Sequence, residues 1–405
     1  MLLSCLWLST LLASVCCLSL HVKVKDATDK VVKLSAEEKA EEWKKIYSNA
    51  PDVQAPTFNC QVDRTPRTPS SVHELRPQDI NVIAALGDSI TAGMAAGAES
   101  MLEIMGEWRG HSWSIGGRNS YEMGIRTMPN ILRKFSEFLR GFSTDEVDVD
   151  DQAAGFNVAV SGSTAEDILE QAQDMVRKMN ANTDVDFAND WKLVTLLIGG
   201  NDLCRVCDDW DLLGPENYLN NVRSTLDHFH FNMPRALINV VLMFDITPLP
   251  IMSDNILCDG WQDIACPCAT DPDDRQRLRE IQRAYGHVLQ ELIASNRYED
   301  RDDFTVVLQP TLYDATPPMD ENGRPRREYW SPDCFHPGLL GHYACGIGLW
   351  NGMFEPVGNK TTVLNWEPTE IKCPTAERPY IFTANNSASA PGELVKQTIY
   401  PTIEL

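Results

Sequence analysis

The chain has 405 residues and a formal net charge of −23, with 58 acidic and 35 basic side chains. A nucleic-acid-binding protein needs an excess of basic residues to neutralise phosphates, so this balance argues against that class of function. It also predicts weak attraction to anionic membranes. If the substrate is a lipid, its capture must depend on apolar contacts or on a local basic patch, for which Arg324, Arg326 and Arg327 are the candidates. We interpret these arginines as part of a solvated loop.

The first twenty residues have the features of a secretory signal peptide. They carry no charge and contain the apolar core Leu6–Leu12, although the usual basic start is absent. An uncleaved anchor is the alternative interpretation. No later stretch reaches the roughly 18 apolar residues that a spanning helix needs, and the last residues lack the hydrophobic tail of a lipid-anchor signal. We therefore expect a secreted, extracellular protein without a transmembrane anchor.

Secretion would favour disulfide formation by the cysteines and glycosylation of two asparagines. The cysteines beyond the signal peptide are Cys60, Cys204, Cys207, Cys258, Cys266, Cys268, Cys334, Cys345 and Cys373. Most should form disulfides, and their odd number leaves at least one unpaired within the chain. Zinc binding by Cys204-x-x-Cys207 and Cys266-x-Cys268 is the alternative, but the second pair has the wrong spacing, so we expect no metal. Asn359 and Asn385 begin sequons for glycosylation.

Strands and helices are predicted to alternate after an N-terminal arm. A helix over 36–47 begins with a capping box formed by Ser35 and Glu38, and residues 51–77 form a connecting arm rich in Pro, Ser and Thr. Short runs of Val, Ile and Leu predict strands at 80–86, 156–160, 192–198, 237–244 and 304–308. Helical patterns predict helices at 129–140, 165–179, 216–231, 273–296 and 338–351.

This alternation indicates a mainly parallel sheet covered on both faces. We therefore predict an α/β fold, a three-layer α/β/α sandwich around a five-stranded sheet. No internal repeat is visible, so one main domain with terminal extensions is the simplest organisation. Its parts are a signal peptide at 1–20, an N-terminal helix and arm at 21–75, the main domain at 76–355 and a C-terminal extension at 356–405.

Polar residues follow the predicted strands at several places. Ser89 lies in Leu-Gly-Asp-Ser-Ile-Thr-Ala-Gly, directly after the first apolar run. Gly162 follows the second run, and Asn201 follows the third within Gly-Gly-Asn-Asp. Asp333 and His336 supply a carboxylate and an imidazole just before the last predicted helix. Ligands bind at the carboxyl edge of open α/β sheets, so we expect these side chains to converge there.

Together these residue types meet the requirements of acyl transfer through a serine nucleophile. The hydroxyl of Ser89 needs a base to take its proton during attack, and His336 is the candidate. Asp333 would select the tautomer of that imidazole and stabilise its positive charge. The backbone N–H groups of Ser89 and Gly162 and the side-chain amide of Asn201 would stabilise the negative charge on the carbonyl oxygen.

Simpler interpretations exist for some of these positions. Asp88 can serve only as a helix cap, and Asn201 only as a turn residue. His342 is a rival base, but its place inside a predicted helix favours a packing role. Trp108 and Trp113, on the loop after the nucleophile, are candidate substrate contacts because aromatic side chains hold acyl chains well.

In their order along the chain, these segments resemble the blocks of the GDSL or SGNH hydrolase family. The matching residues are Gly87-Asp88-Ser89 with Ile90 where leucine is usual, Asn157-Val158-Ala159-Val160-Ser161-Gly162, Gly200-Asn201-Asp202 and Asp333-x-x-His336. The resemblance implies a flavodoxin-like SGNH hydrolase fold for the main domain. It also implies a Ser-His-Asp triad at Ser89, His336 and Asp333, and no cofactor.

A narrower resemblance, to the animal phospholipase B branch, covers roughly residues 75–355 and rests on the segments 108–117, 127–132, 193–204 and 334–337. It implies a serine esterase of phospholipids and lysophospholipids that makes transient contact with lipid surfaces. Many members hold several repeats and a membrane anchor, whereas we expect one repeat and no anchor here. The alternatives are an esterase of retinyl, glyceride or acetylated carbohydrate esters, and a non-catalytic secreted binding protein.

Overall fold

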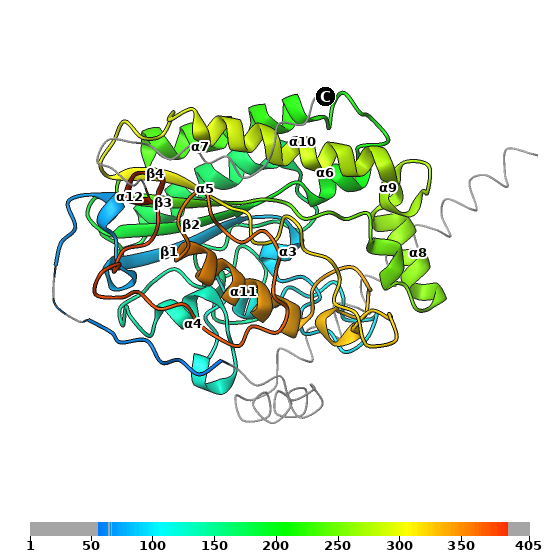
Figure 1. Cartoon of the computed structure of the whole chain (residues 1–405), viewed down its shortest axis with the longest axis horizontal. Helices are drawn as coiled ribbons and strands as arrows, with labels where there is room; N and C mark the ends of the chain where they lie inside the picture. Colours follow the sequence, from blue (N-terminus) through cyan, green and yellow to red (C-terminus); the bar gives the residue numbers. More distant parts are fainter. Residues whose placement is uncertain (1–55, 64, 66, 388–405) are drawn as a thin grey trace, which may run out of the picture.

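The computed structural model describes residues 56–63, 65 and 67–387, and a four-stranded parallel sheet lies at its centre (Figure 1). The strands pair in chain order and are β1 (Ile80–Gly87), β2 (Trp191–Leu197), β3 (Ala236–Val241) and β4 (Phe304–Gln309). All four were predicted from their apolar runs. The predicted signal peptide and the helix over 36–47 lie outside the described residues.

Helices cover both faces of this sheet. They are α3 (Ser89–Ala92), α4 (Met128–Leu132), α5 (Ile168–Ala181), α6 (Gly200–Arg205), α7 (Pro215–Asn232), α8 (Ile256–Ala265), α9 (Pro267–Thr270), α10 (Arg275–Ala294), α11 (Leu339–Met353) and α12 (Ala384–Ser387). Figure 1 shows α5, α7 and α10 over one face and α4 and α11 over the other. The predicted three-layer α/β/α architecture is confirmed.

The strands are mostly apolar because both faces of the sheet are covered. Every residue of β2, β3 and β4 is buried, and such a sheet has continuous apolar runs instead of alternating ones. Lys192 on β2 is a charged residue buried among them. Its Nζ donates to the carbonyl oxygens of Phe187, Asp190 and Pro234, and burial lowers its pKa to about 8.

The predicted fifth strand at 156–160 is wrong, and the sheet has four strands. The segment runs beside β1 but forms only an isolated parallel bridge, between Ala85 and Asn157. A continued ladder would use the N–H of Gly87 as its next donor. That N–H donates instead to Oε1 of Gln171 on α5, at 2.9 Å. A side chain therefore takes the place of the next ladder bond, which the apolar pattern of 156–160 could not reveal.

The helix predicted over 129–140 is also too long, because α4 ends at Leu132. Beyond it the chain turns back toward β1. The hydroxyl of Ser136 donates to the carbonyl of Ile80 at 2.7 Å, and the N–H of Arg140 donates to the carbonyl of Asn81 at 2.9 Å. The other predicted helices closely match α5, α7, α10 and α11.

No helix in the described ranges has both the length and the apolar character needed to cross a membrane.

Segments flanking the main domain pack against it. The Cys60–Cys373 disulfide joins the segment before β1 to the one after α11. The N–H of Ile381 donates to the carbonyl of Leu75 at 2.8 Å, and Ile381 itself is fully buried. We propose that 76–355 is the main domain, with the described flanking segments completing its core.

Four disulfides are present among the described residues, as the cysteine content predicted. Cys204–Cys266 joins α6 to the residue before α9, and Cys207–Cys268 joins the residues just after α6 to α9. Cys258–Cys334 joins α8 to the loop before α11. The sulfurs considered as zinc ligands are therefore bonded to one another. Cys345 is buried and is the one cysteine outside a disulfide in the part of the chain that the structure describes.

Arg109 should be a large contributor to stability. Its guanidinium is fully buried and donates to the carbonyl oxygens of Val147, Asn157 and Ala159, at 3.0, 3.2 and 2.9 Å, and to Glu107. Because Arg109→Met would leave a partly buried carboxylate and three carbonyls without their donor, we expect a loss of roughly 3–5 kcal/mol in the free energy of unfolding, measured with urea.

The exposed Arg177→Met is the matched control and should change the free energy of unfolding by less than about 0.5 kcal/mol. Equal effects of the two substitutions would contradict this account of Arg109.

Candidate active site

The turn after β1 presents Ser89 at the carboxyl edge of the sheet. β1 ends at Gly87, which has a φ of 152° and where a Cβ would lie 2.2 Å from the carbonyl oxygen of Leu197, so a glycine is needed. Asp88 then caps α3, since its Oδ1 accepts the N–H of Ile90 at 2.9 Å. Ser89 is the first residue of α3, and its own N–H therefore has no partner within the helix.

Ser89, His336 and Asp333 lie in one hydrogen-bonded chain. Oγ of Ser89 is 2.8 Å from Nε2 of His336, across 247 positions of sequence. Nδ1 of His336 is 2.6 Å from Oδ2 of Asp333, and all three residues are buried. An ionised carboxylate only accepts hydrogen bonds, so Nδ1 carries the imidazole proton and Nε2 is left to accept the serine hydroxyl.

The loop that holds Asp333 and His336 closes on itself. The N–H of Ser331 donates to the carbonyl of His336 at 2.9 Å, and its hydroxyl donates to Oδ1 of Asp333 at 2.5 Å. The N–H groups of Phe335 and His336 donate to the same oxygen, each at 3.0 Å. Burial would raise the pKa of Asp333, but the charge of His336 and these hydrogen bonds lower it below its usual value.

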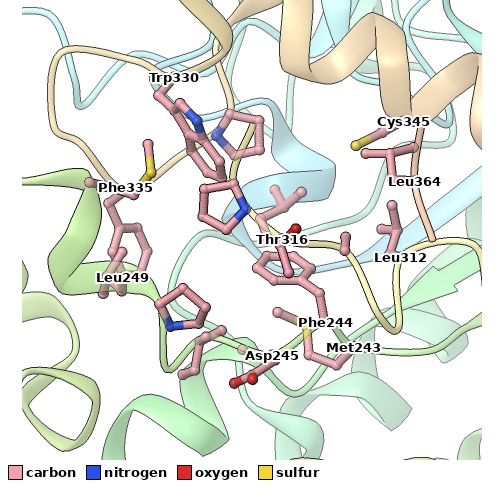
Figure 2. A pocket seen from close by; sticks show the side chains of 18 of the residues that line it. Met243, Phe244, Asp245, Leu249, Leu312, Thr316, Trp330, Phe335, Cys345 and Leu364 are labelled. Atoms are coloured by element: carbon pink, nitrogen blue, oxygen red, sulfur yellow. The ribbon is translucent and has the colours of Figure 1, made fainter. Parts of the chain in front are cut away.

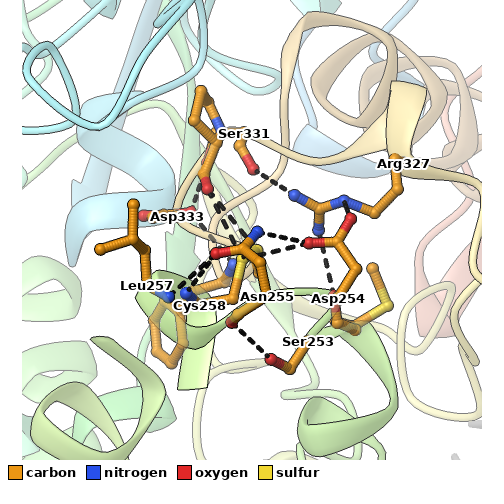
Figure 3. Close-up of polar contacts among 12 residues, drawn as sticks. Ser253, Asp254, Asn255, Leu257, Cys258, Arg327, Ser331 and Asp333 are labelled. Atoms are coloured by element: carbon orange, nitrogen blue, oxygen red, sulfur yellow. Dashed lines mark hydrogen bonds and ion pairs between the residues drawn. A yellow bond between two sulfur atoms is a disulfide. The ribbon is translucent and has the colours of Figure 1, made fainter. Parts of the chain in front are cut away.

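Helix α8 anchors this loop from outside, in the region drawn in Figure 3. The Cys258–Cys334 disulfide joins the helix to the loop between the acid and the imidazole, where Cys334 has a left-handed φ of 58°. Gln262, buried on α8, donates to the carbonyl oxygens of Cys334 and Leu249, at 2.9 and 3.1 Å. No sequence pattern marked Gln262, because a single buried glutamine carries no periodic signal.

Gly162 and Asn201 are linked to the nucleophile turn through Gln171, a second residue that the sequence did not single out. Nε2 of Gln171 donates to the carbonyl of Gly87 at 2.9 Å and to the hydroxyl of Ser163 at 3.0 Å. Nδ2 of Asn201 donates to the carbonyl of Ser163 at 2.8 Å, which leaves its second hydrogen available. Gly162 has a φ of 87°, and no atom lies within 4 Å of where its Cβ would be.

A mostly apolar pocket lies beside Ser89 (Figure 2). Its lining residues come from the β1–α3 turn, from the loops after β3 and β4, and from the segments around α11; they include Met243, Phe244, Ile246, Leu249, Met252, Leu312, Ala315, Trp330, Phe335, Cys345 and Leu364. Figure 2 shows Leu312, Leu364 and Cys345 grouped away from Trp330 and Phe335. Sequence reasoning missed most of this lining because irregular loops carry no periodic pattern.

The two tryptophans predicted near the substrate lie in different places. Trp113 is fully buried and lines the pocket. Trp108 is not among the lining residues and packs against a cluster that includes Ile125 and Leu339. Asn201 lines the pocket together with Ser89.

The rival base His342 is directed elsewhere. Its Nδ1 accepts the N–H of Trp113 at 3.3 Å, whereas the hydroxyl of Ser89 meets His336. Burial lowers the pKa of His342 to about 3, so it stays neutral near pH 7. It lines the pocket as a neutral polar group.

Two buried carboxyl groups lie behind the nucleophile turn. Burial raises the pKa of Asp88 to about 6 and that of Asp202 to about 7. Both oxygens of Asp202 accept the N–H of Ala165 at 3.1 Å, and this contact joins the start of α6 to the segment after Gly162. Asp202 is therefore a structural residue whose charge is poorly solvated.

Comparison with known proteins identifies the family of this chain. The family described as GDSL-like Lipase/Acylhydrolase matches residues 83–346, which is more than half of the chain. The fold and this match define a carboxylic ester hydrolase of the α/β class. The chain belongs to the GDSL-like lipase/acylhydrolase family.

The chain is also similar to curated proteins named phospholipase B1. It is similar to mouse "Phospholipase B1, membrane-associated", with 39% identity over 342 residues, covering 82% of this chain and 23% of that protein. The human protein of the same name is 38% identical over 330 residues, which cover 80% of this chain and 22% of the human protein. The chain thus spans less than a quarter of the length of these relatives. Phospholipase A1 from Streptomyces albidoflavus aligns in structure with a TM-score of only 0.32, at 15% identity over 67% of this chain and 98% of that chain.

The raised pKa of Asp202 predicts a pH-dependent stability. The unfolded group titrates near 3.8 and the folded one near 7, so the folded state binds the proton more tightly and loses stability as pH rises through this window. Asp202→Asn should remove that loss. Between pH 4 and pH 8, the free energy of unfolding of the native chain should therefore fall by a few kcal/mol more than that of the variant. This follows from about 1.4 kcal/mol for each unit by which the pKa is raised.

Urea unfolding at both pH values measures this difference, with the exposed Asp184→Asn as control. A pH dependence in Asp202→Asn equal to that of the native chain would refute the assignment of this effect to Asp202.

Proposed function

We propose that Ser89, His336 and Asp333 form the catalytic triad of an acyl ester hydrolase. Oγ of Ser89 attacks the carbonyl carbon of the ester while Nε2 of His336 takes the hydroxyl proton. Asp333 stabilises the imidazolium that results. His336 then gives this proton to the leaving alcohol, which departs and leaves the acyl group on Ser89.

The acyl-enzyme is hydrolysed by the same groups in reverse. His336 takes a proton from water, the resulting hydroxide attacks the acyl carbonyl, and His336 returns the proton to Oγ of Ser89 as the free acid leaves. The observation that carries the proposal is the buried chain of contacts at 2.8 and 2.6 Å beside an apolar pocket.

The oxyanion donors would be the N–H groups of Ser89 and Gly162 and the side chain of Asn201. Each has the capacity to donate: Ser89 stands at the start of a helix, Gly162 borders open space, and Asn201 keeps one amide hydrogen. Donors fixed in advance are effective because they need no rearrangement as charge develops, and each is worth about 3–4 kcal/mol in measured systems.

We propose phospholipids and lysophospholipids as the substrates. The pocket beside Ser89 is lined mainly by apolar side chains, among them Leu, Met, Phe and Trp, which suit an acyl chain. The name of the mouse and human relatives points the same way. Esters of retinol, glycerol or carbohydrates are the alternative substrates. A purely binding role is less well supported because it does not require the aligned triad.

We also propose that the protein is secreted, with residues 1–20 as its signal peptide, and glycosylated at Asn359 and Asn385. Both asparagines are exposed. The four disulfides are of the kind that persists in an oxidising compartment.

The proposal is tested by hydrolysis of lysophosphatidylcholine, diacyl phosphatidylcholine and dissolved p-nitrophenyl butyrate by the purified full chain. Ser89→Ala and His336→Ala should each lower kcat for all of them by about 10³-fold or more, because each removes a group that acts in the transition state. Asp333→Asn should lower kcat by roughly 10²- to 10⁴-fold, because the imidazole loses its orienting carboxylate.

The exposed Ser224→Ala on α7 is the control and should retain full activity. Near-native turnover in Ser89→Ala would exclude the triad. Normal hydrolysis of the short ester with none of either phospholipid would favour another ester as the substrate.

A further inference from the structure

Helix α8 exposes large apolar side chains to solvent. Ile256 is 84% exposed, Ile264 is 78% exposed and Leu257 is 61% exposed. Monomeric soluble proteins seldom gather such side chains on one element unless something binds there. The inward side of the same helix is already used, because Cys258 and Gln262 are buried against the loop of His336.

The exposed residues share one face of α8. Ile256, Gly260 and Ile264 follow one another at intervals of four residues, and Leu257 and Trp261 form the next row around the helix. Buried Cys258 and Gln262 stand on the opposite side. The inner face of the helix is therefore held by a disulfide and a buried amide. Its outer side carries exposed apolar rows, and the exposed Asp259 and Asp263 border the row of Ile256.

This outer face continues onto a neighbouring turn. Trp261 packs against the small cluster formed by Met94, Ala95 and Ile104. In the same turn, Leu102 and Met105 are 79% and 60% exposed. We call the exposed residues Leu102, Met105, Ile256, Leu257 and Ile264 the α8 apolar surface.

The α8 apolar surface adjoins the pocket. Met252, which lines the pocket, precedes α8 by four residues. Ile251, beside it, is half exposed, and Leu249 lines the pocket while its carbonyl accepts a bond from Gln262 of α8. Figure 1 shows α8 at the same end of the sheet as α3, which begins with Ser89.

Charges near the surface argue against docking on an anionic membrane. Asp254, Asp259 and Asp263 are exposed on or next to α8. The arginines of the basic patch considered from the sequence are all paired with carboxylates: Arg324 with Asp320, Arg326 with Glu328 and Glu367, and Arg327 with Asp254, the last drawn in Figure 3. An acidic border instead complements the trimethylammonium groups at the surface of choline phospholipids.

We infer that the α8 apolar surface docks the protein on a zwitterionic choline-phospholipid surface, with the pocket mouth against the lipid. The inference rests on the proposed function for its substrate class. Ile256, Leu257 and Ile264 enter the interface between headgroups and acyl chains, while Asp259 and Asp263 remain among the cholines. A phospholipid then reaches Ser89 without crossing open water.

Binding is measured by sedimentation with phosphatidylcholine vesicles, using the full chain with Ser89→Ala so that the vesicles are not hydrolysed. Adding Ile256→Asp and Ile264→Asp should lower the vesicle partition coefficient by about tenfold or more. Phe231→Asp is the matched control: Phe231 is 77% exposed, but it lies on α7 just before β3, at the opposite edge of the sheet, and should change nothing.

A second pair of variants tests the charge argument in the opposite direction. Asp259→Lys with Asp263→Lys should leave Ile256 and Ile264 in place and raise binding to vesicles that contain phosphatidylglycerol, by about tenfold or more. Unchanged binding to these vesicles, or unchanged phosphatidylcholine binding in the Ile256→Asp and Ile264→Asp variant, would overturn the inference.

Dissolved p-nitrophenyl butyrate separates this inference from the proposed function. Neither Ile256 nor Ile264 lines the pocket, so their substitution with Ser89 intact should lower turnover of phosphatidylcholine vesicles and leave turnover of the dissolved ester within about twofold. Equal losses on both substrates would contradict docking. Absence of ester turnover in the native chain would reject the proposed function but leave the vesicle result standing. A lipid-free dimer that these substitutions convert to a monomer would show that a second copy covers the surface, and would also overturn the inference.

Discussion

The contact between the hydroxyl of Ser89 and Nε2 of His336 constrains most of the rest of the fold. It joins two residues 247 positions apart, so the end of β1 and the loop before α11 must meet at one edge of the sheet. The parallel strand order brings both there. The contact also needs a rigid partner loop, which the four hydrogen bonds around Asp333 and the Cys258–Cys334 disulfide provide.

The same edge divides a polar region from an apolar one. On one side of Ser89 lie hydrogen-bonding groups, including the buried Gln171 side chain that bonds to both Gly87 and Ser163, and Asn201 stands where they border the pocket. On the other lie the apolar loops of the pocket. An ester has the same division, with a polar carbonyl beside an acyl chain. The site therefore suits a substrate whose reacting group and tail need different surroundings.

The sequence predicted the parts of this structure that local patterns specify. β2, β3 and β4 are buried on both faces, so their apolar runs were unambiguous. The segment 156–160 has the same composition, but Gln171 takes the N–H of Gly87 that a further ladder bond would use. The helix at 129–140 failed for a similar reason, since Ser136 and Arg140 bond to the start of β1. Both failures come from contacts between distant residues, which no local pattern records.

The residues of the candidate site also divide into those that the sequence singled out and those that it did not. Ser89, Asp333 and His336 were found because their chemistry imposes recognisable residue types next to strand ends, and the structure brings them together. Gln262, Gln171 and the apolar lining were not found, because a buried amide or a methionine in an irregular loop has no distinctive spacing. The pairing of Cys258 with Cys334 was likewise open until the loop and α8 were seen side by side.

The central claim is that His336 activates Ser89 as a nucleophile. The most direct test is the rate and position of covalent labelling by a fluorophosphonate, followed by peptide mass spectrometry of the native chain and of His336→Ala. The account predicts one label per chain, on Ser89, and labelling slowed by about 10²-fold or more in the variant. A label on another residue, or an equal rate in His336→Ala, would contradict it.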